Sequence, residues 1–176
     1  MKSVRSSLAV VMAIAVVAGS LAGAAYAAEW SKSSLHDIVK AAQDKVKDKG
    51  DATLVRVDAV GLKEDGTFDL SQPGATVTVQ FKAGGKAWSV SYVPIGQPEP
   101  YTSVAESPVP GEPLPADVAK GLKDGAEYAK AAKSAGLSFP ANISIYSPEA
   151  GKAWAVIADN EGKSVILNPT TGEKIQ

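Results

Sequence analysis

The side chains with which this chain could do chemistry are few. It contains one histidine, His36, and no cysteine among its 176 residues. A zinc or copper site needs several imidazole or thiolate ligands, so the composition argues against such a site. Hydrolysis by a Ser-His-Asp triad would depend on His36, and no Gly-x-Ser-x-Gly motif occurs to present a serine nucleophile. We therefore expect this protein not to be an enzyme.

Carboxylates are the remaining reactive groups, and four of them lie around a predicted turn: Asp58, Glu64, Asp65 and Asp69. A calcium loop of the EF-hand type needs twelve residues that end in a bidentate glutamate, and this spacing does not provide them. The pair Asp65-Gly66 is typical of a hairpin turn, so a metal site is not needed to account for it. A second glycine pair, Gly84-Gly85, is not followed by a helix that would bind phosphate. Neither a metal nor a cofactor is expected.

Binding is the alternative to catalysis, and polar residues on two predicted strands offer a surface for it. A strand over 75–82 alternates Val77, Val79 and Phe81 with polar residues, and a glycine turn leads into a second strand. An antiparallel sheet with helices on one face leaves its other face to solvent. We expect that face to bind a protein or peptide through six polar side chains: Thr76, Thr78, Gln80, Lys86, Ser89 and Ser91.

A short motif built around tryptophan occurs twice. Gly85-Lys86-Ala87-Trp88-Ser89-Val90 returns as Gly151-Lys152-Ala153-Trp154-Ala155-Val156. Each copy follows a turn and has the character of a strand, in which residues two apart share a face. Buried aromatic residues mostly serve packing, so we expect a shared core role, with ligand stacking as the alternative for each tryptophan. The predicted core residues are Trp88, Val90, Trp154 and Val156, and the recurrence predicts two related halves.

The first 27 residues have the composition of a secretory signal peptide. Lys2 and Arg5 form a positive start, 8–21 is apolar, and Ala25-Tyr26-Ala27 provides a small-residue cleavage site. We expect cleavage after Ala27, export to the periplasm or beyond, and no membrane span after cleavage. The remaining chain has 16 basic and 19 acidic residues, and this net charge of −3 does not indicate a nucleic-acid partner.

Hydrophobic periodicity predicts the same order of elements in both parts of the remaining chain. Helices are predicted over 33–50 and 116–134. Strands are predicted over 53–61, 67–70 and 75–82, at the two tryptophan motifs, and over 142–147 and 164–167. The predicted fold class is α+β, with two related halves, 28–93 and 116–176. Each half is a helix followed by antiparallel strands, with the helices packed on one face of the sheet.

The connection between these halves, 94–115, holds seven of the eleven prolines. Such a run favours extended backbone and argues against a helix or a paired strand. It is either a spacer in solvent or an ordered strap laid across the domain through Tyr101, Val104 and Leu114. Long loops in compact domains are uncommon unless they are functional, so this strap is a candidate partner segment.

The order of helix and Trp-x-Val strands, followed by Asn168-Pro169-Thr170-Thr171-Gly172-Glu173, resembles the end of PepSY-type domains, where an Asp-x-x-Thr-Gly-like turn follows a short strand. Asn168 stands where the family's turn commonly starts with aspartate. The segment 51–70 also resembles uncharacterised exported bacterial proteins of that build. The resemblance covers most of the chain as two degenerate tandem copies. It implies a non-catalytic extracytoplasmic module, sometimes an inhibitor or regulator of peptidases, and assigns no catalytic residue.

These observations favour a protein- or peptide-binding module outside the cytoplasm. A structural or assembly component of the cell envelope is the alternative. In the first case the polar face or the strap contacts the partner, and in the second an exposed strand edge or the strap contacts another envelope component.

Overall fold

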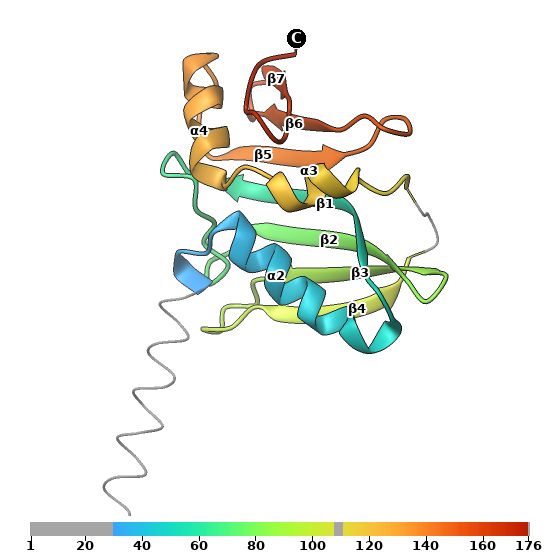
Figure 1. The fold of residues 1–176 in the computed structure, drawn as a ribbon. Helices are drawn as coiled ribbons and strands as arrows, with labels where there is room; N and C mark the ends of the chain where they lie inside the picture. The colour runs from blue at the N-terminus through green and yellow to red at the C-terminus, as the bar shows by residue number, and fades with distance from the viewer. Residues whose placement is uncertain (1–29, 108–110, 176) are drawn as a thin grey trace, which may run out of the picture.

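One antiparallel sheet of seven strands forms the body of the protein. The structure, a computed structural model, describes residues 30–107 and 111–175, so the predicted signal peptide lies outside the described residues. The spatial order of the strands is β4-β3-β2-β1-β5-β6-β7, and every neighbouring pair is antiparallel (Figure 1). Their bounds are β1 Thr53–Leu62, β2 Thr76–Ala83, β3 Lys86–Val93, β4 Tyr101–Glu106, β5 Ala141–Tyr146, β6 Trp154–Ala158 and β7 Ser164–Leu167. The predicted α+β class with antiparallel strands is confirmed.

The strands β1 and β5 join the two parts of the chain at the middle of the sheet. Each follows helical segments and starts a run of strands towards one edge, and the pair meets in a register that places Asp58 opposite Ser144. The repeated tryptophan motifs do not occupy matching places in these runs. Trp88 lies on β3, two strands from β1, whereas Trp154 lies on β6, next to β5. The predicted repeat of two equivalent halves is therefore not confirmed.

The helices α2 Leu35–Val46, α3 Ala116–Gly121 and α4 Gly125–Ser134 lie on one side of the sheet (Figure 1). Ser34 caps α2 by accepting a hydrogen bond from the Asp37 backbone N–H at 3.1 Å. A 3₁₀ turn, η1 Lys47–Lys49, follows α2. The predicted apolar stripe of α2 is buried at Leu35, Ile38, Ala42 and Val46.

The single helix predicted over 116–134 is wrong, because the chain breaks between α3 and α4. Asp124 starts α4 in a capping box: its carboxylate accepts from Gly125 N–H at 2.8 Å, and Glu127 accepts from Asp124 N–H at 2.9 Å. The same carboxylate also accepts from the Leu35 N–H at 3.2 Å, so it connects the starts of α2 and α4. Asp124 therefore starts a new helix and favours the break before it.

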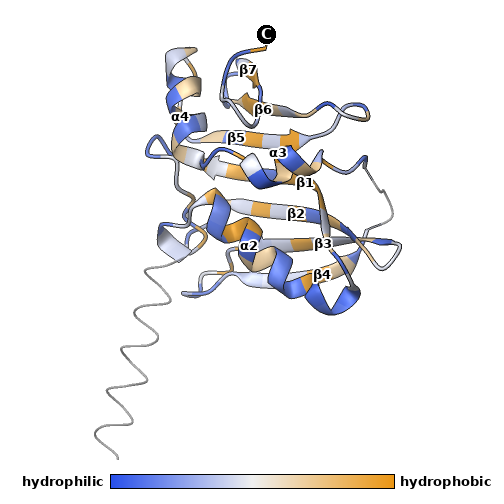
Figure 2. Ribbon diagram, in the orientation of Figure 1, coloured by the Kyte–Doolittle hydropathy of each residue, from blue (hydrophilic) through white to orange (hydrophobic). Residues whose placement is uncertain are grey.

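The core lies between the helices and the sheet. Strand β2 shows the pattern most clearly, since Val77, Val79 and Phe81 are buried while the residues between them are half-buried. Figure 2 shows the corresponding alternation of hydrophobic and polar residues along the strands. The strand predicted over 67–70 does not form. Phe68 and Leu70 are instead fully buried from a loop that makes a single bridge to Ser33.

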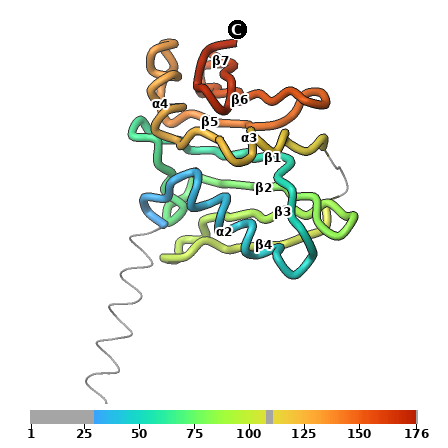
Figure 3. The backbone as a smooth tube through the Cα atoms, viewed as in Figure 1, coloured from blue at the N-terminus to red at the C-terminus, as the bar shows by residue number. Residues whose placement is uncertain are grey.

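The Pro-rich connection contains a strand, which the sequence interpretation excluded. The interval 101–106 between Pro100 and Pro108 has no proline, so it can pair with β3 as the edge strand β4 (Figure 3). Further on, Leu114 is buried and its N–H donates to the Leu54 carbonyl at 2.9 Å. Tyr101 and Val104 are exposed, so among the predicted strap residues only Leu114 packs into the core.

Two buried tyrosines differ in how their hydroxyl groups are satisfied. Tyr128 is fully buried and donates to the Pro169 carbonyl at 2.8 Å. Tyr92 is 1% exposed and packs against Trp30, and its hydroxyl has no hydrogen-bond partner among the described residues. Tyr128→Phe should lower the free energy of unfolding by about 0.5–1.5 kcal/mol, because it removes a buried hydrogen bond, while the Pro169 carbonyl keeps the one from the Lys123 N–H at 2.9 Å. Tyr92→Phe should be neutral or stabilising. Denaturant titration of both variants tests this, and an equal loss in both would contradict it.

Both tyrosines should also make the protein labile to alkali. Burial raises the pKa of Tyr92 to about 12 and raises the pKa of Tyr128 as well. An unfolded tyrosine titrates near pH 10, so above about that pH the unfolded chain releases protons that the folded chain retains. Their contribution to stability is complete below about pH 10 and is lost as the pH rises through the folded-state pKa values. Tyr92→Phe should make the loss of stability above about pH 10 less steep, whereas an unchanged slope would contradict this assignment.

Candidate binding face

The face of the sheet away from the helices is open and carries five of the six predicted polar residues. Thr78 lies opposite Ser91, with 3.0 Å between their hydroxyl oxygens, and Gln80 lies opposite Ser89. Thr76 shares this face, two residues before Thr78. Together they form a half-buried polar surface over β2 and β3.

Lys86 is the exception, and its assignment to this face is wrong. The register of β2 and β3 places Lys86 opposite the buried residue Ala83, so its side chain leaves the sheet on the helix side. There it forms an exposed ion pair with Glu106, at 2.8 Å. Counting alternation from Trp88, which shares the helix side, would have given this result.

A group of charged and aromatic residues continues the open face across the centre of the sheet. Arg56 donates to both carboxylate oxygens of Asp58, at 2.6 and 2.9 Å, and Ser144 donates to Asp58 at 2.7 Å. The hydrogen bond with Asp58 raises the pKa of Arg56, so the guanidinium stays charged. It lies 5.2 Å from the centre of the Tyr146 ring. Trp154 packs edge-on against Tyr146, with 6.3 Å between ring centres and 72° between ring planes.

The strand register places these residues in one row. Arg56 is opposite Tyr146, and Tyr146 is opposite Trp154. On the other side of Arg56 the row continues through Gln80 and Ser89. We name Arg56, Tyr146 and Trp154 the Arg-aromatic cluster. Sequence reasoning missed it because the cluster depends on β1 pairing with β5, which is a contact between distant parts of the chain.

The predicted core role of the second tryptophan motif is wrong. Trp154 and Val156 are half-buried on the open face, whereas Ala155 and Ile157 point into the core. Ala155 lies opposite the buried residues Ile145 and Leu167, and this register fixes which side of β6 faces the helices.

The first motif lies on the core side, as predicted. Val90 is fully buried there. Trp88 is half-buried against the core, where its indole N–H donates to the Ala83 carbonyl at 3.2 Å. The ammonium group of Lys49 lies 5.1 Å from the centre of its ring.

The two tryptophans should therefore differ in their contribution to stability. Trp88→Ala should lower the free energy of unfolding by about 2–3 kcal/mol, because it removes packing against the core and a hydrogen bond. Trp154→Ala should cost about 1 kcal/mol or less, as expected for a residue on a solvent-facing surface. Thermal melts of both variants distinguish the two roles, and a larger loss for Trp154→Ala would contradict them.

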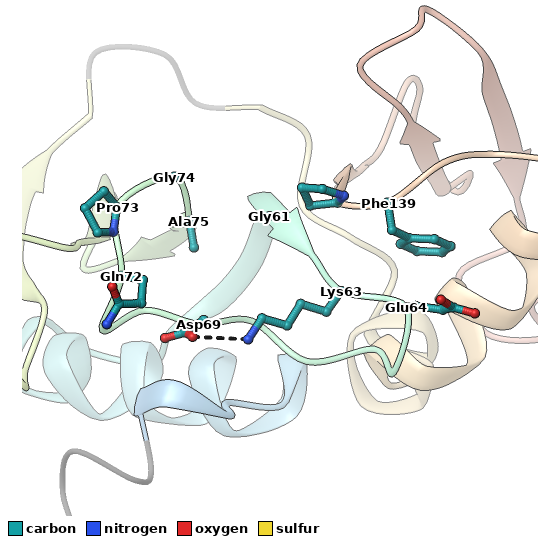
Figure 4. A pocket seen from close by; sticks show the side chains of 10 residues that line it. Gly61, Lys63, Glu64, Asp69, Gln72, Pro73, Gly74, Ala75 and Phe139 are labelled. Atoms are coloured by element: carbon teal, nitrogen blue, oxygen red, sulfur yellow. Dashed lines mark hydrogen bonds and ion pairs between the residues drawn. The ribbon is translucent and has the colours of Figure 1, made fainter.

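A pocket of about 390 Å³ lies at one end of the sheet, between the β1–β2 connection and the segment before β5 (Figure 4). Pro73 and Gly74 line it from one side, and Phe139 lines it from the other. Asp69 at its base accepts from Lys63 at 3.1 Å and from the Ser71 hydroxyl at 2.6 Å. Burial raises the pKa of Asp69, but these hydrogen bonds outweigh burial and hold the pKa below its usual value. This carboxylate is ionised and paired, which suits a structural role.

The remaining chemistry-bearing residues lie apart from one another. Glu64 is paired with Lys133, and Asp65 accepts from the hydroxyl of Thr67 at 2.6 Å. His36 lies on the exposed side of α2, with 2.7 Å between its Nε2 and the Leu122 carbonyl oxygen, to which it donates. Within the described ranges, no group of three or more His, Cys, Asp or Glu side chains could hold a metal ion.

The fold defines an α+β protein with one antiparallel sheet, helices on one face and an open opposite face. No family model and no curated protein matches this chain. A solved structure from Clostridium difficile 630, described as a "putative lipoprotein", is similar with a TM-score of 0.54. The match has 12% identity and covers 80% of this chain and 89% of that one. Likeness at this identity shows the fold alone, and the PepSY resemblance is not confirmed.

None of the helices in the described ranges, 30–107 and 111–175, is long and apolar enough to cross a membrane.

Proposed function

We propose that this protein is a non-catalytic module that binds a protein or peptide outside the cytoplasm, through the open face of its sheet. The observation that carries this proposal is the cross-strand row from Ser89 and Gln80 to the Arg-aromatic cluster. The row presents hydrogen-bonding groups at one end and aromatic side chains at the other, across five paired strands of the sheet, β3 to β6.

The shape and chemistry of this face suit a polypeptide partner. Tyrosine, tryptophan and arginine are the residues that most often dominate the energy of protein interfaces. Tyr146 and Trp154 are half-buried, so they are held in place by their neighbours and lose little conformational freedom when a partner covers them. The serine and threonine side chains over β2 and β3 can supply the polar contacts around them.

The proposal that the protein is exported rests on the sequence of its first 27 residues. The lipoprotein description of the similar structure is consistent with export. The PepSY resemblance makes this proposal more specific: the partner is a peptidase that this protein inhibits or regulates. The tandem arrangement of two PepSY-like halves belongs to the same proposal.

A structural or assembly role in the cell envelope is the second candidate. One observation favours it: the edge strand β4 is unpaired on its outer side in the described part of the chain. An unpaired edge is a site at which another chain can add a strand.

Affinity capture with matched variants tests the proposal. Immobilised protein should retain a specific protein from an envelope extract, and Trp154→Ala should lose it, because the substitution removes the largest side chain of the open face. Lys40→Ala on the exposed side of α2 is the control and should retain it. The same variants, assayed against secreted peptidases, test the inhibitor version. Equal capture by all three proteins would show that the open face is not the binding surface.

A further inference from the structure

In the described part of the chain, one edge of the sheet is covered by the C-terminal residues and the other edge is not. Beyond β7 the C-terminal residues fold back: Ile175 N–H donates to the Ile166 carbonyl at 2.8 Å, and Asn168 N–H donates to the Glu173 carbonyl at 2.8 Å. A bridge between Leu167 and Lys174 completes this cover. The other edge, β4, pairs only with β3 among the described elements.

The register shows which backbone groups of β4 face outwards. Ser107 N–H donates to the Ala87 carbonyl at 2.8 Å, so odd-numbered residues of this strand direct their polar groups to β3. Because these groups alternate along a strand, the N–H and C=O groups of Thr102, Val104 and Glu106 point away from the sheet. They have no backbone partner in the described part of the chain.

This edge lacks the features that normally prevent strands from pairing. Between Pro100 and Pro108 it has no proline, no lysine and no bulge, and its one charge, Glu106, is paired with Lys86. It also carries an exposed apolar side chain on each face of the sheet: Val104, 40% exposed, on the helix side and Tyr101, 58% exposed, on the open face. Val93, opposite Tyr101, adds a second exposed apolar side chain on the open face.

We propose that β4 pairs with β4 of a second copy of this chain, antiparallel and about a two-fold axis at Val104. In this register Val104 faces Val104 of the second copy, and each Thr102 faces Glu106 of the other chain. All three residues with outward-pointing backbone groups then exchange hydrogen bonds across the junction. Side chains on the two chains also keep the same faces, so the helices of both copies lie on one side of a continuous sheet.

Two features favour a second copy of this chain as the partner of β4: the charges that face each other across the junction, and the symmetry of the contact. No like charges lie directly opposite in this register, since each Glu106 faces a threonine and has its own Lys86. The contact is isologous, and the cover over β7 prevents further addition at the other edge. Association should therefore stop at a dimer. The contact is small, so the dimer should be reversible and depend on concentration.

Cysteine cross-linking tests both the contact and its register, because the chain has no cysteine of its own. In Val104→Cys the two sulfurs meet on the axis, within the distance that a disulfide needs. In Thr102→Cys the two positions lie about 14 Å apart, which is beyond the reach of a disulfide. On mild oxidation, Val104→Cys should form covalent dimer about tenfold more efficiently than Thr102→Cys.

Sedimentation of the unmodified protein supplies the second measurement. It should show a monomer–dimer equilibrium, and Val104→Lys should give only monomer, because two like charges then face each other on the axis. Circular dichroism checks that this variant remains folded. A strictly monomeric parent protein, or equal cross-linking at positions 102 and 104, would overturn the proposal. Neither result depends on the open face, so this proposal stands or falls separately from the proposed binding function, although a β4 dimer would occupy the edge on which the envelope candidate rests.

Discussion

Replacing Gly66 by alanine should lower the free energy of unfolding by about 4 kcal/mol or more, enough to prevent folding of a marginally stable domain. Gly66 has φ of +84°, a conformation that residues with a Cβ atom rarely adopt. A Cβ atom there would also overlap the backbone of Ala126, in the first turn of α4. Gly125 approaches the Gly66 carbonyl in the same way, so two glycines allow the turn after β1 to contact the start of this helix.

Gly162→Ala is the matched control for this prediction. Gly162 has φ of +86° in a similar turn, but a Cβ atom there would have no atom within 4 Å. It should cost only the left-handed conformation, about 1–2 kcal/mol. Chemical denaturation of both variants separates backbone strain from the close approach. Similar losses in the two variants would show that the helix can move away from the turn at little cost.

Ile145→Ala should lower the free energy of unfolding by about 2–5 kcal/mol and should affect the whole sheet. Ile145 is fully buried on β5, opposite Val57 at the junction of β1 with β5. Since this junction joins the two runs of strands, a cavity there should destabilise both. Hydrogen exchange should accelerate by the same factor for the most protected amides of β3 and of β6.

Ser144→Ala, at the neighbouring position on the open face, is the control. It removes one hydrogen bond to Asp58 and should cost about 1 kcal/mol or less. If Ile145→Ala accelerated exchange only in β5, β6 and β7, the protein would be two independent domains. The part of the Pro-rich connection that follows β4 would then act as a linker between them.

Local pattern was sufficient to predict most elements of this fold. The stripe of α2 and the alternation of β2 follow directly from the side-chain periods of helices and strands. Polar alternation also placed Thr78 and Ser91 correctly on the open face. The break before α4 could have been found, because Asp124 and Glu127 form a capping-box pattern three residues apart.

Long-range pairing determined what the sequence could not predict. The Arg-aromatic cluster requires β1 to lie beside β5, and no local pattern specifies that neighbour. The same holds for Trp154: its strand alternates correctly, but which side faces the helices depends on its pairing with β5 and β7. The two tryptophan motifs are similar in sequence and differ in position, so their similarity predicted an equivalence that the sheet does not have.

Photo-crosslinking from a single position tests the proposed binding face most directly. A photoreactive amino acid replaces Ser89 on the open face in one strain and Gln43 on the exposed side of α2 in another, with the protein at its natural location. We predict a discrete protein adduct from position 89 that disappears when Trp154→Ala is added, and no such adduct from position 43. An adduct from position 43 alone, or one from position 89 that Trp154→Ala leaves unchanged, would contradict the account.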